Sequence, residues 1–186
     1  GLSDLDGFVA ARGPGSFTGL RIGLAVVKGL GFALGKPCFG VSSLDGIAFQ
    51  FAHSAMPVCV MMDARRGEVY SAVYRFEKGT LASKSREQAL VPEKACELAG
   101  QEDVLYAGSG AKAYRGVIEA LADQPLFSSH HQDPVSAAAL IRAMNTPDTR
   151  FDPVAAAEHY PLEPVYLRKS DAQVNLEKQS SKFGLQ

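Results

Sequence analysis

The chain has 186 residues, of which 46% are hydrophobic and 21% charged, and its formal net charge is −1. This length and hydrophobic content suffice for a sizeable core in one or two domains. The near-neutral charge excludes a protein that grips nucleic acid by itself over a broad basic surface. A nucleic-acid partner would therefore be held only together with other proteins.

The first predicted elements are a strand and a helix joined by a glycine-rich loop. The apolar run Phe8 to Ala11 predicts a short buried strand, and the nearly non-polar segment Phe17 to Leu34 predicts a helix. In the loop, Gly13 and Gly15 permit positive φ, and Ser16 is placed to cap the helix. A strand at 38–40 and a helix at 43–53 follow.

The segment after Met56 predicts a longer series of elements, read from periodicity and from glycine and proline punctuation. Its expected order is three strands, a helix, a strand, a helix, a strand and a helix. The expected ranges are strands at 58–62, 69–76, 81–89, 104–107 and 126–127, with helices at 92–99, 111–122 and 134–144.

The front of the chain repeats the second half of that βββαβαβα unit. Its glycine loop Gly13-Pro14-Gly15 corresponds to Gly108-Ser109-Gly110 in the later copy. Two such copies predict an α/β protein of the actin-like, Hsp70-like ATPase (RNase H-like) fold. The first copy would lack a βββα block of roughly 45 to 50 residues. We therefore expect a fragment or truncated product with an exposed strand edge.

This organisation predicts three regions. Residues 1–54 would form the second half of a truncated first lobe, and residues 55–160 a complete second lobe. Residues 161–186 would form an extended strap and a polar tail, because Pro161 and Pro164 exclude a regular helix. The lysine-rich segment Lys169 to Gln186 is expected to be disordered or to dock on a partner.

The cysteine pattern and the N-terminus bear on the compartment. Cys38, Cys59 and Cys96 are odd in number and lie far apart in apolar segments, which predicts reduced, buried thiols and a cytosolic protein. The apolar segment 17–34 approaches membrane-spanning length, but Arg21, Lys28 and its glycines interrupt it. The N-terminus has no signal pattern, so we expect no membrane association.

Four ordered blocks carry a family resemblance. They are Gly-Pro-Gly-Ser-Phe-Thr-Gly-Leu-Arg-Ile-Gly at 13–23, Gly-Val-Ser-Ser-Leu-Asp at 40–45, Asp-Ala-Arg-Arg-Gly-Glu-Val-Tyr at 63–70 and Pro-Val-Tyr-Leu-Arg at 164–168. Together they closely resemble the TsaB (YeaZ) family, the non-catalytic partner in bacterial synthesis of threonylcarbamoyladenosine on tRNA. The family begins with a β-rich block carrying an Asp-Thr pair, which this chain lacks.

The resemblance implies the actin-like fold and a subunit without catalytic residues of its own. It implies pairing with a TsaD-like catalytic paralogue, a TsaE-like ATPase in the assembly, self-pairing into a homodimer, and tRNA contact only through the complex. ATP and metal would be bound by the partner subunits, and this chain would bind no cofactor. The helix at 17–34 resembles the family's pairing helix.

The faces of that helix predict where a partner binds. Placed at 100° per residue, Ile22, Val26, Leu30 and their neighbours would face the sheet. The other face mixes aromatic, leucine and cationic side chains, which is typical of an interface. The predicted partner-binding residues are Phe17, Leu20, Arg21, Leu24, Lys28 and Phe32. Alternatively, the missing N-terminal helix covers this face.

Two segments could contact an anion. Gly15 and Ser16 lead into a helix N-terminus, which can bind phosphate, but neither Walker A nor dinucleotide-binding spacing is present. Arg65 and Arg66 lie in the turn where ATPases of this superfamily place a phosphate-contacting hydroxyl, which is absent here. Alternatively, Gly15 and Ser16 belong to a purely structural loop. Arg65 and Arg66 could likewise serve only in hairpin formation and salt bridges rather than as anion contacts.

Two rival functions come from other classes. One is an independent nucleotide-binding ATPase or phosphotransferase of the same superfamily. The other is a glycoprotease-like peptidase, which the sequence disfavours because the four histidines offer no metal-binding pair and no Gly-x-Ser-x-Gly elbow occurs. The sequence therefore predicts neither metal ligands nor catalytic residues.

Overall fold

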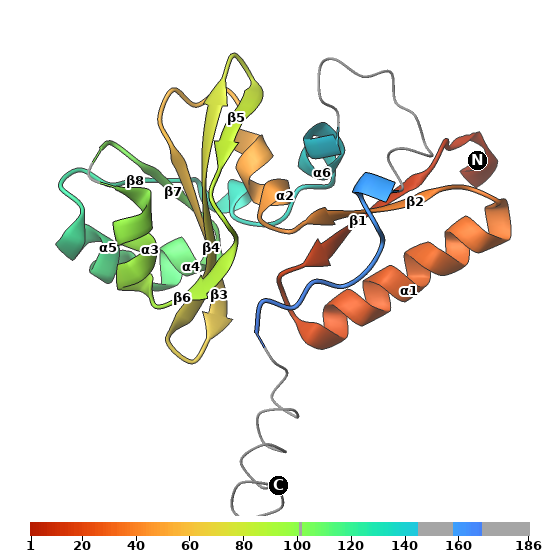
Figure 1. Cartoon of the computed structure of the whole chain (residues 1–186), viewed down its shortest axis with the longest axis horizontal. Helices are drawn as coiled ribbons and strands as arrows, with labels where there is room; N and C mark the ends of the chain where they lie inside the picture. The colour runs from red at the N-terminus through yellow and green to blue at the C-terminus, as the bar shows by residue number, and fades with distance from the viewer. Residues whose placement is uncertain (101, 145–157, 169–186) are drawn as a thin grey trace, which may run out of the picture.

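The structure is a computed structural model that describes residues 1–100, 102–144 and 158–168. Two β-sheets lie side by side with helices between them and on their outer faces (Figure 1). The predicted polar tail at 169–186 lies outside the described residues.

The first lobe is built around two parallel strands, β1 (Phe8–Gly13) and β2 (Cys38–Ser42). The 18-residue helix α1 (Phe17–Leu34) connects them, and a short 3-10 turn η1 (Leu2–Asp4) precedes β1. The Ser16 Oγ accepts a hydrogen bond from the Gly19 N–H at 3.3 Å, so Ser16 caps α1 as predicted. Gly35 ends the helix in the left-handed region with φ 62°.

The second lobe contains a six-stranded sheet with the order β5-β4-β3-β7-β8, and β6 also pairs with β4. β3 is antiparallel to β4 and parallel to β7. Its strands are β3 (Val58–Arg65), β4 (Glu68–Glu77), β5 (Thr80–Lys84), β6 (Gln88–Leu90), β7 (Leu105–Ala107) and β8 (Leu126–Phe127). Its helices are α3 (Pro92–Ala99), α4 (Ser109–Ala113) and α5 (Arg115–Leu121), followed by η3 (His130–Gln132).

Two tight turns shape the meander of β3, β4 and β5. Arg66-Gly67 and Lys78-Gly79 each have positive φ at both residues, as two-residue type I′ hairpins require. Arg65 also has positive φ, at 61°, where the β3–β4 register shifts. The two turns were predicted from their glycines, whereas the left-handed Arg65 was not.

Three predicted elements are broken in the structure. The strand expected at 81–89 divides into β5 and β6, because Ser85 exchanges hydrogen bonds with the Val73 backbone where the chain bends. The helix expected at 111–122 becomes α4 and α5, interrupted at Tyr114 with φ −111° and ψ 26°. The helix expected at 43–53 shortens to α2 (Asp45–Ala48) and the 3-10 turn η2 (Phe49–Phe51).

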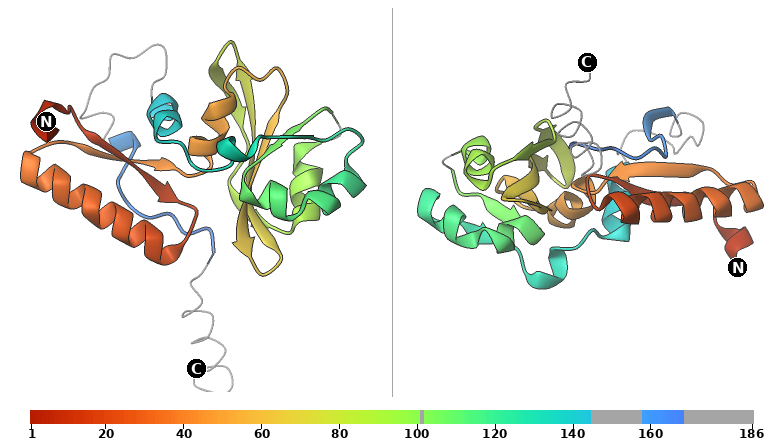
Figure 2. Two further views of the ribbon diagram at one scale, coloured as in Figure 1. Left: turned by 180° about the vertical axis from the view of Figure 1, so that it is seen from behind. Right: turned by 90° about the horizontal axis from the view of Figure 1, so that it is seen from below.

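At the junction of the lobes, each lobe contributes a helix that packs on the sheet of the other lobe (Figures 1 and 2). Leu44, Ile47 and Phe49, in and around α2 from the first lobe, pack on the face of the second sheet formed by Val58, Val60 and other residues. Conversely, Leu140 and Met144 of α6 (Ala137–Met144) pack on β2 of the first lobe at Phe39 and Val41. Each sheet therefore buries a helix from the other lobe, and these two helices join the lobes.

The segment 161–168 runs as an extended strap from the first lobe to the second. The Gly40 N–H donates to the Tyr160 carbonyl at 2.9 Å, and the Val165 N–H donates to the Arg12 carbonyl at 2.8 Å. At the far end, Arg168 forms an ion pair with Glu68 of β4 at 2.9 Å. The strap therefore ties β2 and β1 to the first hairpin of the second lobe.

Candidate interaction helix and interlobe cleft

Helix α1 presents a broad apolar surface. Phe32 is 93% exposed, Ile22 61% and Val26 56%. α1 runs along the outside of the first lobe, with its far side turned away from the rest of the molecule (Figures 1 and 2). Because large exposed apolar side chains gathered on one element mark interaction sites, we define the outer face of α1 as Ile22, Val26 and Phe32.

The packed face of α1 differs from the sequence prediction. Leu24, predicted to contact a partner, is 4% exposed and lies against the first lobe, whereas Ile22 and Val26, predicted to face the sheet, are exposed. The buried Gly31 explains this orientation: a Cβ built there would lie 2.9 Å from the Lys36 carbonyl and would overlap the Cys38 Sγ. Only a glycine lets the helix approach β2 so closely, and this contact turns Leu24 inward.

Two further predicted partner residues, Phe17 and Arg21, contact the chain's own strap. The Phe17 and Tyr166 rings lie 4.8 Å apart between centroids, and the Arg21 guanidinium carbon lies 3.8 Å from the Phe17 ring centroid. The Arg21 Nε also donates to the Tyr166 hydroxyl at 3.2 Å. This cation–π and aromatic cluster joins the start of α1 to the strap.

The remaining predicted partner residues divide between the two faces. Lys28 and Phe32 are exposed, and Phe32 belongs to the outer face. Leu20 is half-buried, and its Cδ1 lies 3.2 Å from the Cβ position of Gly13 in the preceding loop. Of the six predicted residues, Phe32 and Lys28 are thus the best placed for a contact with another molecule.

By length and composition alone, α1 is the one helix among the described residues that could cross a membrane. The core helix of a soluble protein and a signal sequence pass the same test. Leu24 and Gly31 are buried in α1 and attach it to its own lobe. Arg21 and Lys28 lie exposed along it, and such charges are costly within the hydrocarbon core of a bilayer.

A cleft of about 700 Å³ separates the two lobes on the side of the glycine loop. It brings together three of the four predicted anion contacts, Gly15, Ser16 and Arg65. The fourth, Arg66, is not among its lining residues. Other groups in its walls are Thr18, Asp63, Tyr70, Ser109 and the strap residues Val165 to Arg168.

Local hydrogen bonds fix the arrangement of this cleft. The Arg65 N–H donates to the Asp63 carboxylate at 2.8 Å, and the Asp63 N–H donates to the Ser109 Oγ at 3.1 Å. Ser109 comes from the later glycine loop, so the repeat brings both loops to one cleft. The amide, hydroxyl and guanidinium groups of this cleft can donate hydrogen bonds to an anion. The Asp63 carboxylate, however, repels negative charge there.

Sequence reasoning did not identify Ser109 or Tyr166 as site residues. The Gly-Ser-Gly loop was noted as the counterpart of the first glycine loop, and this correspondence could have indicated the cleft. Tyr166 lies 145 residues from Arg21. The family-resemblance block Pro164 to Arg168 was the one available signal for its role.

The three cysteines were predicted to be reduced, buried thiols. Cys59 and Cys96 are buried, Cys38 is partly buried, and all three are free. Burial raises the pKa of the Cys59 thiol to about 12. Among the described residues, no three His, Cys, Asp or Glu side chains lie close enough to hold a metal ion.

Comparisons with known proteins agree with this architecture. The sequence profile of the TsaD family, described as tRNA N6-adenosine threonylcarbamoyltransferase, matches residues 1–176. The TsaB protein of Bacillus subtilis, named as a tRNA threonylcarbamoyladenosine biosynthesis protein, is 31% identical over 176 residues, covering 91% of this chain and 72% of the relative. The Escherichia coli protein of the same name is 43% identical over 96 residues, covering 50% and 41%.

Solved structures extend the likeness to three dimensions. YeaZ from Pseudomonas aeruginosa superimposes with a TM-score of 0.66 at 29% identity, covering 90% of this chain and 76% of that one. This similarity confirms the predicted actin-like, RNase H-like fold class. With the glycine loop, α1 and the strap in the places described, the chain belongs to the TsaB (YeaZ) family of tRNA threonylcarbamoyladenosine biosynthesis proteins.

Proposed function

We propose that this protein is a non-catalytic scaffold subunit in the synthesis of N6-threonylcarbamoyladenosine on tRNA. It pairs with a TsaD-like catalytic subunit through the outer face of α1 and supports threonylcarbamoyl transfer by that subunit. A TsaE-like ATPase joins the assembly in the cytoplasm, and tRNA is contacted only through the complex. ATP and metal are bound by the partner subunits.

The exposed outer face of α1 is the observation that carries this proposal. Burying a Phe, Ile or Val side chain contributes about 1.5–3 kcal/mol each, so three such residues on one helix can anchor an interface. Gly23 and Gly29 lie on the same helix with open space around them. Their lack of side chains allows a partner helix to approach the backbone of α1 closely.

The scaffold role is also supported by the chemistry of the first hairpin in the second lobe. The turn that follows Asp63 contains Arg65 and Arg66 in place of a hydroxyl residue. Both arginines have positive φ, so they are part of the tight backbone turn of the hairpin. A turn of this kind is suited to a structural or partner contact rather than to phosphoryl transfer.

Co-purification with a TsaD-like subunit tests the proposal. Ile22→Glu and Val26→Glu place a charge on the outer face of α1 and should reduce recovery of the complex at least tenfold. Leu121→Glu is the matched control, because Leu121 is 57% exposed on α5 in the other lobe. Its complex should form normally, and normal complex formation by both α1 variants would contradict the proposal.

A homodimer would use the same face of α1 and would compete with the TsaD-like subunit. Light scattering on the isolated chain, with and without Val26→Glu, measures this self-pairing. The variant should shift any dimer to a monomer, because two copies would bring two carboxylates into one apolar contact.

Nucleotide binding is the second candidate function. The cleft that brings Gly15, Ser16 and Arg65 together favours it, since amides and hydroxyls can surround a phosphate. Calorimetric titration with ATP and Mg²⁺ tests it, with Arg65→Gln as the variant that should weaken binding. No cluster of potential metal ligands among the described residues supports the glycoprotease-like alternative.

A further inference from the structure

A second cavity, of about 620 Å³, lies at the junction of the lobes away from the glycine-loop cleft. It shares no lining residue with that cleft. Its walls come from β1, β2, the region of α2 and η2, the β4–β5 hairpin, α6 and the start of the strap. Six segments of the chain thus surround one hollow.

Arg12 supplies an unsatisfied donor to this cavity. Its Nε atom is buried and has no hydrogen-bond partner among the described residues. The side chain passes close over the backbone of Gly40, where an added Cβ would lie 3.1 Å from the Arg12 Cδ. A buried donor left unpaired is destabilising, and an acceptor bound in the cavity would offset this cost.

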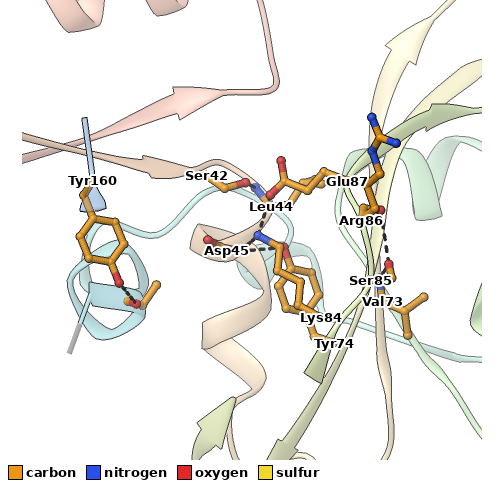
Figure 3. A network of polar contacts seen from close by, with 11 residues as sticks. Ser42, Leu44, Asp45, Val73, Tyr74, Lys84, Ser85, Arg86, Glu87 and Tyr160 are labelled. Atoms are coloured by element: carbon orange, nitrogen blue, oxygen red, sulfur yellow. Dashed lines mark hydrogen bonds and ion pairs between the residues drawn. The ribbon is translucent and has the colours of Figure 1, made fainter. Parts of the chain in front are cut away.

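The other charged groups around the cavity leave it positive. Arg142 of α6 lines it, as do His53 and His159. Asp45, the acidic residue in its wall, forms an ion pair with Lys84 at 2.6 Å and accepts the Tyr74 hydroxyl at 2.8 Å (Figure 3). Lys84 is shared between Asp45 and Glu87, so this cluster keeps one net negative charge. The two cations Arg12 and Arg142 that line the hollow outweigh it.

The rest of the wall is apolar or aromatic. Val41, Phe49, Ala52 and Leu81 line it together with Tyr160. The Tyr160 hydroxyl donates to the Ala143 carbonyl at 3.3 Å, so this hydroxyl already has a partner within the protein (Figure 3). A ligand that fits this hollow therefore has an anionic group and a body with an apolar surface.

We propose that this cavity binds a small molecule through a phosphate or carboxylate group held by Arg12 and Arg142. Guanidinium groups bind both kinds of oxyanion with paired, charge-assisted hydrogen bonds. The apolar wall around Phe49 and Leu81 receives the body of the ligand. This site is separate from the partner face of α1 and does not depend on the scaffold role.

Calorimetric titration of the purified chain tests the site with matched probes. AMP and benzoate carry the two oxyanions, and adenosine and benzyl alcohol are their uncharged counterparts. At least one anionic probe should bind, and its uncharged counterpart should bind at least tenfold more weakly. The anion that binds identifies the headgroup. If neither AMP nor benzoate binds, the proposal is overturned.

Variants locate the bound probe. Arg12→Gln should weaken its binding tenfold or more, since a charge-assisted hydrogen bond contributes about 1.5–3 kcal/mol. Arg142→Gln changes an exposed residue and should weaken binding several-fold without affecting the fold. Arg115→Gln changes an exposed residue of α5 that lines neither cavity, so it is the control and should leave binding unchanged. Loss of binding in this control, or full binding in the Arg142 and Arg12 variants, would refute this site.

Discussion

The backbone of Gly31 on α1 lies directly against the Sγ of Cys38 on β2, with no room for a side chain between them. The Cys38 thiol also donates to the Val27 carbonyl of the same helix at 3.4 Å. This contact fixes both the distance of α1 from the sheet and its rotation about its own axis. It therefore decides which apolar residues remain exposed on the outer face.

Alanine substitutions at glycines of α1 should have opposite effects on stability. Gly31→Ala should destabilise the protein by about 1–3 kcal/mol, because its Cβ would overlap Cys38. Gly23→Ala and Gly29→Ala face open space and should stabilise it by up to about 1 kcal/mol through helix propensity. Urea unfolding midpoints measure all three. Equal effects at positions 23 and 31 would contradict this packing.

Local signals were sufficient for most of the elements. The bounds of α1 and α3 match their predictions because serine and proline mark their starts and glycine follows their ends. The rotation of α1 could not be predicted, because apolar and glycine residues surround the whole helix. What selects its packed face is the contact of Gly31 with Cys38, which depends on the path of β2.

In the candidate sites too, features with a local sequence pattern were predictable, and contacts between residues far apart in the sequence were not. The two glycine loops occupy equivalent places in a repeat, which could have indicated their common cleft, although the prediction did not make this step. The contacts of Phe17 and Arg21 with Tyr166 join residues at least 145 positions apart, and no local pattern indicates them. The cavity around Arg12 likewise depends on six separate segments and could not be predicted from periodicity.

Leu24 and Ile22 should respond differently to substitution although they lie two residues apart. Leu24→Ala should cost about 2–5 kcal/mol of stability, because it removes a buried side chain. Ile22→Ala should change stability by less than about 0.5 kcal/mol and should weaken association with a TsaD-like subunit. Thermal unfolding and co-purification separate the two effects. A stable Leu24 variant that fails only in association would contradict the burial of Leu24.

Removing the Tyr166 ring should release the strap from α1. Tyr166→Ala abolishes both the ring contact with Phe17 and the hydrogen bond from Arg21. We expect faster cleavage within residues 161–168 in limited proteolysis, with the rest of the protein unaffected. Tyr166→Phe is the control, because it keeps the ring and loses only the hydroxyl. Equal cleavage rates for Tyr166→Ala and the unmodified chain would disprove this role.

The Lys84–Asp45 ion pair should stabilise the junction of the lobes up to alkaline pH. Burial lowers the pKa of the Lys84 ammonium, but attraction to Asp45 and Glu87 outweighs this effect and raises the pKa above its ordinary value of 10.5. The folded protein therefore holds the proton more tightly than the unfolded chain does. The resulting stabilisation is complete below pH 10.5 and disappears as the pH rises through the folded pKa.

Urea unfolding of the unmodified chain and of Lys84→Met between pH 7 and 11.5 tests this dependence. The stability difference between them should be constant up to about pH 10 and shrink above it. Lys94→Met provides a surface comparison, because the exposed Lys94–Glu97 pair should contribute less than about 1 kcal/mol. If the stability difference between the unmodified chain and Lys84→Met instead grew with pH, the pKa of Lys84 would be lowered, not raised, in the folded protein.

The three thiols should differ in reactivity according to their burial. Cys59 is buried and its pKa is raised to about 12, so it is almost entirely protonated at pH 8.5. Cys38 is only partly buried and should react first with iodoacetamide, although burial raises its pKa as well. Peptide mass spectrometry after timed labelling measures each rate, and labelling in concentrated urea should make the three alike. Because alkylation requires the thiolate, rapid native labelling of Cys59 would mean that β3 opens far more often than its buried position allows.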